Sequence, residues 1–145
     1  MRRFDLQRPV FIEAESNKVG ERHIPPALWQ RMRGAQSLQV TAPLEARVAF
    51  LVEDYHHVIA EPGRLDPLLG WVTSRIGHEA VTVWRNHIDR GDWPGFVSCV
   101  LRDHYDPAYD RSAAKRYHRD LETLTSASLD NTAIDALAGR LAEMG

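Results

Sequence analysis

Two short stretches of the chain hold most of the residue types that could do chemistry. Residues 104–112 place an imidazole, two phenols, two carboxylates and an arginine within nine positions. Residues 9–16 contain an apolar run followed by two carboxylates, Glu13 and Glu15. Acids at the carboxyl end of a buried parallel strand typically hold Mg²⁺ through water or activate a nucleophile. The two stretches are therefore the first candidates for a functional site.

The apolar run predicts a strand over Val10–Glu13, and the two carboxylates would share one face because they lie two positions apart. Ser16 and Lys18 follow directly. A hydroxyl, a cation and a nearby glycine suit a loop that approaches phosphate. The alternative interpretation is a pair of solvated carboxylates at a strand end, since motifs this short are weak evidence.

The second stretch, residues 104–112, is predicted to be a loop whose proline restrains the backbone. Tyr105 and Tyr109 could stack on a nucleobase, and Arg111 could bind a phosphate in bidentate fashion. His104 could carry a proton near neutral pH. The alternative is an Asp-Pro turn whose tyrosines close the core. The residue types alone favour neither interpretation.

Hydrophobic periodicity predicts the elements that must position these residues. Besides the strand ending at Glu13, strands are predicted at residues 37–41 and 121–125. Helices are predicted after Pro25, after Pro43, over the apolar stripes at residues 65–76 and 81–88, after Asp92 and after Asp130. This order indicates an α/β sheet edge that carries a helical insertion, and not a complete doubly wound sheet.

The composition bounds the class of protein. A chain of 145 residues allows one domain with a real core, and 43% apolar with 26% charged residues is ordinary for a globular protein. The net charge of −2 gives no global basic field, although a local basic face is compatible with it. No apolar run is long enough to span a bilayer or to serve as a signal peptide, so a cytoplasmic protein is expected.

The single cysteine and the four tryptophans are predicted to be structural. One cysteine excludes an internal disulfide and the paired-cysteine metal motifs, and Cys99 lies among apolar residues of a predicted helix. The tryptophans are expected in the core. No resident metal site is predicted.

Several motifs resemble the tRNA 2-selenouridine synthase family, in order and at similar spacing, over about residues 5–115. Linked motifs in register are stronger evidence than any one alone. They are Arg8–Gly20 (RPVFIEAESNKVG), Ala42–Val48 (APLEARV), Glu53–Tyr55 (EDY), Gly91–Trp93 (GDW) and His104–Ser112 (HYDPAYDRS).

The resemblance implies an N-terminal rhodanese domain followed by a P-loop domain, acting on the wobble uridine of tRNA. It implies transfer of a geranyl group from geranyl diphosphate to the sulfur of 2-thiouridine, and then replacement of the sulfur by selenium from selenophosphate. The expected partners are thus tRNA and these two small substrates, with no membrane. No tightly bound cofactor is expected, and Mg²⁺ would arrive with the diphosphate.

The resemblance also assigns roles to residues. The expected catalytic residues are Glu15, His104 and Asp106. The expected substrate and phosphate contacts are Glu13, Ser16, Lys18, Arg47, Tyr105, Tyr109, Arg111 and Ser112.

Two parts of the family pattern are missing from this sequence. It has neither a rhodanese loop with a catalytic cysteine nor a Gly-x-x-x-x-Gly-Lys-[Ser/Thr] motif. We therefore expect the C-terminal part of a P-loop-like domain over residues 1–112, with a strand and helix extension over residues 113–145. The expected fold is a partial P-loop-type parallel sheet edge with a predominantly helical C-terminal region.

The missing parts leave several functional hypotheses open. The chain could be a truncated product that retains part of the enzyme's site, and its activity alone is undecided. It could instead be a catalytically inactive tRNA-binding module, a remnant, or a subunit that needs a separate rhodanese and P-loop half. A homo-oligomer is compatible with the last hypothesis.

Overall fold

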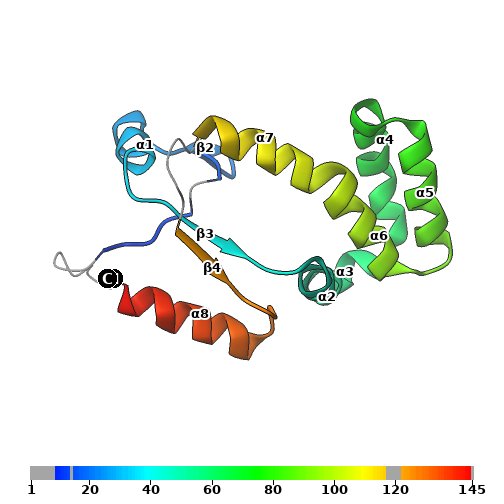
Figure 1. The fold of residues 1–145 in the computed structure, drawn as a ribbon. Helices are drawn as coiled ribbons and strands as arrows, with labels where there is room; N and C mark the ends of the chain where they lie inside the picture. The colour runs from blue at the N-terminus through cyan, green and yellow to red at the C-terminus, as the bar shows by residue number, and fades with distance from the viewer. Residues whose placement is uncertain (1–8, 14, 117–121, 145) are drawn as a thin grey trace.

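The computed structural model describes residues 9–13, 15–116 and 122–144 as a mixed α/β fold (Figure 1). A 3₁₀ turn at Pro62–Leu65 and a π-helical segment at Leu101–Tyr105 supplement the regular elements. These elements are β1 (Lys18–Val19), β2 (Arg22–His23), α1 (Pro26–Arg33), β3 (Leu38–Thr41), α2 (Leu44–Asp54), α3 (His56–Ile59), α4 (Asp66–Ile76), α5 (His78–Asp89), α6 (Trp93–Val100), α7 (Asp106–Arg116), β4 (Glu122–Thr125) and α8 (Asn131–Glu143).

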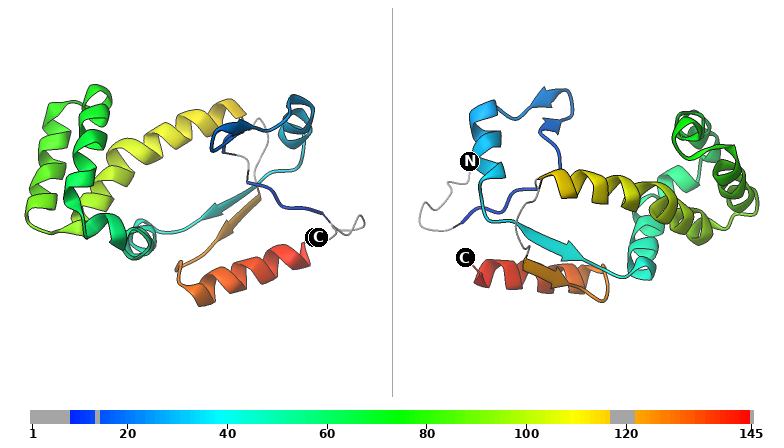
Figure 2. Two further views of the ribbon diagram at one scale, coloured as in Figure 1. Left: turned by 180° about the vertical axis from the view of Figure 1, so that it is seen from behind. Right: turned by 45° about the horizontal axis from the view of Figure 1, so that its top comes forward.

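Strands β3 and β4 form a parallel pair, which confirms the predicted parallel sheet edge. The register places Leu38 opposite Glu122 and Thr41 opposite Thr125, where the two threonine hydroxyls lie 3.0 Å apart. The N–H of Ser126 donates to the carbonyl of Thr41 at 2.9 Å and extends the pairing. Helices α7 and α8 lie on opposite sides of this pair (Figures 1 and 2).

The core lies away from the sheet, within the helices α4, α5 and α6. Leu69, Val72, Val81 and the fully buried Trp84 form its centre, which confirms the predicted apolar stripes except at Leu68, whose side chain is exposed. Trp84 Nε1 donates to Asp103 Oδ2 at 3.3 Å, which satisfies the one polar atom of its ring.

The prediction that all four tryptophans are core residues was wrong for Trp71. Its side chain is largely exposed, and the guanidinium of Arg75 lies 3.7 Å from its ring centroid. The buried residues of α4 are Leu69 and Val72, and Trp71 projects from another side of the helix.

Helix ends follow the predicted signals. Pro26 occupies the first turn of α1, where its missing N–H removes no helical hydrogen bond. Asp92 and Asp130 cap α6 and α8, accepting the N–H groups of Gly95 and Ala133 at 3.0 and 2.9 Å.

The strand predicted over Val10–Glu13 was wrong. Residues 9–13 adopt no regular structure, and their apolar side chains are exposed. A strand requires a hydrogen-bonding partner for its backbone groups, and within the described residues the two-stranded sheets β1–β2 and β3–β4 include none of residues 9–13. Pairing begins later, in the hairpin β1–β2, where Gly20 supplies the positive φ of its turn.

The loop predicted over residues 104–112 was also wrong, because this stretch is helical. The backbone continues without a break from α6 through the π-helical segment into α7. Pro107 falls at the second position of α7, and the wider π turn precedes it, which relieves the conflict between a proline ring and the preceding turn. The predicted strand at residues 121–125 is confirmed as β4, with Leu121 outside the described residues.

Candidate functional site

The helical conformation of residues 104–112 arranges the predicted site residues on one face. Each of the residues 104, 105, 111 and 112 lies three or four positions from residue 108. Residues at these spacings are neighbours on one face of a helix. Tyr105 and Tyr109 stack with ring centroids 6.2 Å apart and planes inclined by 15°. One face of α7 and its π-helical start thus carries most of the predicted chemistry.

The start of α7 is fixed to α2 by a bidentate ion pair. Arg47 donates from Nη2 to Asp106 Oδ1 at 2.5 Å and from Nη1 to Oδ2 at 3.1 Å. The hydrogen bonds to Asp106 raise the pKa of Arg47, so the guanidinium remains charged. Both residues were predicted to act directly on substrate, as a cation and as a catalytic acid. In this structure each has the other as its partner.

A large apolar cavity of about 630 Å³ opens beside this ion pair. Its walls come from α2, α3, α4 and α6 and are almost entirely aliphatic or aromatic, including Phe50, Leu68, Trp71 and Phe96. The polar groups among its lining residues are on Arg47, Tyr55, His104 and Tyr105, with the indole N–H groups of its tryptophans. A cavity of this size, apolar with a few converging polar groups, is typical of small-molecule sites.

His104 is positioned at the cavity by an aromatic contact. Its imidazole lies edge-on to the indole of Trp71, with centroids 6.1 Å apart and planes inclined by 88°. The residue is half-buried. This contact holds the imidazole where a ligand in the cavity would meet it.

A second, polar hollow of about 560 Å³ lies further along the same face of α7. It brings together four predicted site residues from distant parts of the chain: Glu15, Ser16, Arg111 and Ser112. Trp29 of α1 and Asn17 complete its lining together with Ala108. A guanidinium and two hydroxyls in one open hollow can bind a phosphate group.

The two hollows are electrostatically connected through Tyr105. Burial raises the pKa of the Tyr105 phenol, and the nearby carboxylate of Glu15 raises it further. Tyr105 lines the apolar cavity, whereas Glu15 lines the polar hollow. The apolar cavity and the polar hollow therefore lie close to each other along α7.

Four predicted residues line neither hollow: Glu13, Lys18, Asp106 and Tyr109. Lys18 is exposed in β1, and Glu13 is exposed in the segment before Glu15. The N–H of Glu15 donates to the Glu13 carboxylate, so the two acids form a local turn and do not share a strand face. Their predicted roles in substrate binding stay predictions.

Mg²⁺ fits this region only as part of a complex with substrate. Within the described residues no group of three or more histidine, cysteine or acidic side chains converges on one point. The polar hollow does offer the carboxylate of Glu15 and the hydroxyl of Ser16. Mg²⁺ is commonly held by one or two carboxylates plus substrate phosphates, so this donor set suits an ion that arrives with a diphosphate.

Sequence reasoning missed the apolar cavity and the tryptophan beside the polar hollow. Leu68 and Trp71 share the three-residue spacing of a core stripe, and the sequence alone does not distinguish a core wall from a cavity wall. Trp29 carried a clearer signal, because it is an aromatic residue in a short helix that contains two arginines and no acid.

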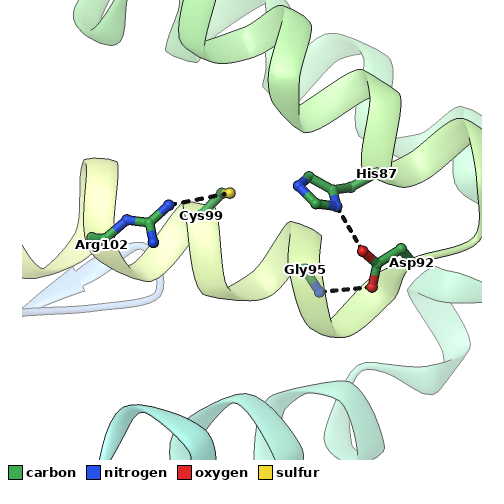
Figure 3. A network of polar contacts seen from close by, with 5 residues as sticks. All are labelled: His87, Asp92, Gly95, Cys99 and Arg102. Atoms are coloured by element: carbon green, nitrogen blue, oxygen red, sulfur yellow. Dashed lines mark hydrogen bonds and ion pairs between the residues drawn. The ribbon is translucent and has the colours of Figure 1, made fainter.

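A polar network at the start of α6 is structural (Figure 3). Asp92 accepts the Gly95 N–H and lies 2.8 Å from His87 Nδ1. The hydrogen bond from Gly95, followed by that from His87, lowers the pKa of Asp92. Cys99 is buried as predicted, and its Sγ accepts a weak hydrogen bond from Arg102 Nη2 at 3.6 Å. None of these five residues lines either hollow.

The fold and the site define the chain as an α/β domain with an apolar cavity beside a polar hollow. The family profile described as the tRNA 2-selenouridine synthase AAA domain matches residues 2–64. A tRNA 2-selenouridine synthase of Cupriavidus pinatubonensis is 26% identical over 138 aligned positions. These matches confirm the predicted resemblance of the chain to the tRNA 2-selenouridine synthase family.

The match to the Cupriavidus protein covers 77% of this chain and 38% of the relative. No solved structure matches the chain significantly. Among the described residues, no helix has the length and apolar character that crossing a membrane requires.

Proposed function

We propose that this chain takes part in modifying the wobble 2-thiouridine of tRNA, by geranylation followed by selenation. The observation that carries the proposal is the apolar cavity beside the polar hollow on one face of α7. An allylic diphosphate has matching parts, a branched hydrocarbon chain and a charged head. The name of the curated relative, tRNA 2-selenouridine synthase, supports the class of product.

In the first step, the uridine sulfur forms a bond to C1 of the geranyl group while the C1–O bond to diphosphate breaks. The electron pair of that bond leaves with the diphosphate, which Arg111 and the hydroxyls of Ser16 and Ser112 bind. The apolar cavity holds the geranyl chain and excludes water from it. His104, at the polar end of the cavity, accepts the proton that the thiouridine base loses.

In the second step, the selenium of selenophosphate bonds to C2 of the uridine and the geranylated sulfur leaves. The leaving thiolate takes up the proton that His104 carries, and hydrolysis of the selenium–phosphorus bond releases phosphate. Mg²⁺, when bound with the diphosphate or selenophosphate, neutralises phosphate charge. Glu15 and Ser16 are the residues that would hold it.

The test is calorimetric titration with geranyl diphosphate and with inorganic diphosphate, each with Mg²⁺. The comparison distinguishes binding of the geranyl chain from binding of the diphosphate group. Leu68 lines the cavity and is 58% exposed, so Leu68→Glu places a charge in the wall without disturbing the core. Val83 is similarly exposed at 47%, lies on α5 outside the cavity and gives the matched control Val83→Glu.

We expect Leu68→Glu to weaken the binding of geranyl diphosphate at least tenfold, which corresponds to about 1.4 kcal/mol, while Val83→Glu has no effect on it. Arg111→Ala should weaken the binding of both ligands, whereas Leu68→Glu should leave the affinity for inorganic diphosphate unchanged. Equal affinities of the Leu68→Glu and Val83→Glu variants for geranyl diphosphate, or no binding by the wild-type chain, would refute the assignment of the cavity.

One observation favours a second candidate function, a subunit that acts with a polypeptide supplying a phosphate-binding loop. Within the described residues the sheet has only two parallel strands, whereas such sheets are usually larger and covered on both faces. Val40 of β3 and the apolar side chains of residues 10–12 are exposed. Co-expression with the remaining part of the Cupriavidus relative tests this candidate. A stable complex that Val40→Lys weakens supports it, and separate elution of the two chains excludes it.

A further inference from the structure

A third hollow, outside the site described above, lies between the hairpin β1–β2 and helix α1. Its volume is about 700 Å³. The hairpin is closed beneath it by the N–H of Ile24, which donates to the carbonyl of Asn17 at 2.8 Å. Figures 1 and 2 place the hairpin and α1 at the end of α7 remote from α4 and α5. The hollow is lined by Asn17, His23, Ile24, Pro25, Pro26, Trp29, Gln30, Arg33 and Gly34.

The hairpin and α1, which enclose this hollow, carry a net positive charge. Between residues 17 and 34 the chain has four basic side chains, on Lys18, Arg22, Arg31 and Arg33, and a single carboxylate, on Glu21. Within the described residues none of these four cations forms an ion pair. By contrast, four other arginines do pair with acids, at positions 47, 64, 85 and 102. Unpaired cations grouped on one small unit indicate a polyanionic partner.

The lining also carries groups that recognise nucleobases. Trp29 is half-buried and presents an aromatic ring to the hollow, and such rings stack on unpaired bases. The side-chain amides of Asn17 and Gln30 have no hydrogen-bond partner within the part of the chain that the structure describes, and both line the hollow. An amide can donate to and accept from the edge of a base. Pro25 and Pro26 make the rim rigid, which lowers the entropic cost of binding.

The position of the hollow relates it to the proposed reaction. Trp29 and Asn17 line both this hollow and the polar hollow that contains Glu15 and Arg111. A base stacked on Trp29 would therefore neighbour whichever group occupies the polar hollow. We propose that the hollow between the hairpin and α1 binds an unpaired RNA nucleotide adjacent to the one that reacts. Trp29 stacks on its base, Asn17 and Gln30 contact the base edge, and Arg33 with His23 binds phosphate.

This inference rests on the proposed function for the choice of a tRNA anticodon loop as the RNA. The test uses the full chain and a fluorescently labelled anticodon stem-loop with 2-thiouridine at the wobble position. Its dissociation constant is measured by fluorescence anisotropy over a range of salt concentrations. Arg33→Gln removes one cation of the hollow, and Arg140→Gln on the exposed face of α8 is the matched control. Trp29→Phe retains stacking, whereas Trp29→Ala removes it.

We expect Arg33→Gln to weaken RNA binding several-fold. It should also lower the slope of log K against log salt concentration by about one, while Arg140→Gln changes neither quantity. Trp29→Ala should weaken binding at least tenfold, and Trp29→Phe should retain most of the affinity. A fully paired RNA duplex should compete poorly. Binding that is indifferent to Arg33→Gln and Trp29→Ala, equal competition by the duplex, or no RNA binding would overturn the inference.

The same variants distinguish this inference from the proposed function. Arg33 lines neither the apolar cavity nor the polar hollow, so Arg33→Gln should leave geranyl diphosphate binding unchanged. Loss of RNA binding alone in that variant supports the RNA site. A wild-type chain that binds RNA but no geranyl diphosphate would refute the cavity assignment and leave the RNA site standing.

Discussion

The ion pair between Arg47 and Asp106 gives the sharpest test of how the site is assembled. It joins residues 59 positions apart and fixes the start of α7 to α2. A double-mutant cycle with Arg47→Ala, Asp106→Ala and the double variant isolates its coupling energy, which urea unfolding followed by circular dichroism can measure.

The expected magnitude follows from the geometry. Two unit charges about 4 Å apart attract by about 4 kcal/mol at an effective dielectric constant of about 20. The side chains are 26% and 37% exposed, so water screens them and ordering them costs entropy. Exposed pairs usually contribute about 0.2–1 kcal/mol, and bidentate geometry favours the upper end. We therefore expect a coupling energy of about 1 kcal/mol at low salt, decreasing at about 1 M salt.

The exposed pair Arg64–Glu61 is an internal control. Its atoms lie 3.8 Å apart, and its side chains are 62% and 68% exposed. The same cycle on this pair should give a coupling energy close to zero. If the two cycles give equal values, or the Arg47–Asp106 coupling does not depend on salt, the argument that this pair fixes α7 is incorrect.

Three further predictions concern backbone conformation and pH. Gly77 has a φ of +87°, so Gly77→Ala should lower the unfolding free energy by about 1–3 kcal/mol. Gly139 lies inside α8 with open space around it, so Gly139→Ala should raise the unfolding free energy by about 0.5–1 kcal/mol. Thermal melts check the sign of both changes. Burial and Glu15 raise the pKa of Tyr105, so the folded state holds that proton more tightly than the unfolded state. Stability should fall as pH rises above about 10, and less so in Tyr105→Phe; equal alkaline slopes would contradict this. Backbone hydrogen bonds lower the pKa values of Asp92 and Asp130, so their contribution is present above the unfolded value and is lost as the pH falls through the lower folded values. Asparagine still caps but does not titrate, so the double Asp→Asn variant should lose less stability between about pH 5 and pH 3 than the wild type does, as acid unfolding curves would show.

The site predicted from the sequence was partly brought together and partly rearranged. Glu15, Ser16, Arg111 and Ser112 do meet in one hollow, although the strand expected to deliver Glu15 does not exist. Short motifs predict which residue types occur together along the chain. They do not predict the conformation that presents them, because that depends on partners elsewhere in the chain.

The sequence by itself determined the elements whose signals are local. Aspartates at helix starts, prolines in first turns and apolar residues at spacings of three and four specify α1, α2, α4, α5, α6 and α8, because each signal acts within a few residues. The alternation at residues 37–41 likewise predicted the strand β3.

Tertiary structure alone decided the rest. Residues 9–13 pair with no strand among the described residues, and the polar residues 104–112 continue α6 as a helix whose start is linked to α2 by a salt bridge. The apolar cavity exists because stripes from several helices face one another without filling the space between them. Such features depend on distances between residues far apart in the chain, and no local pattern encodes those distances.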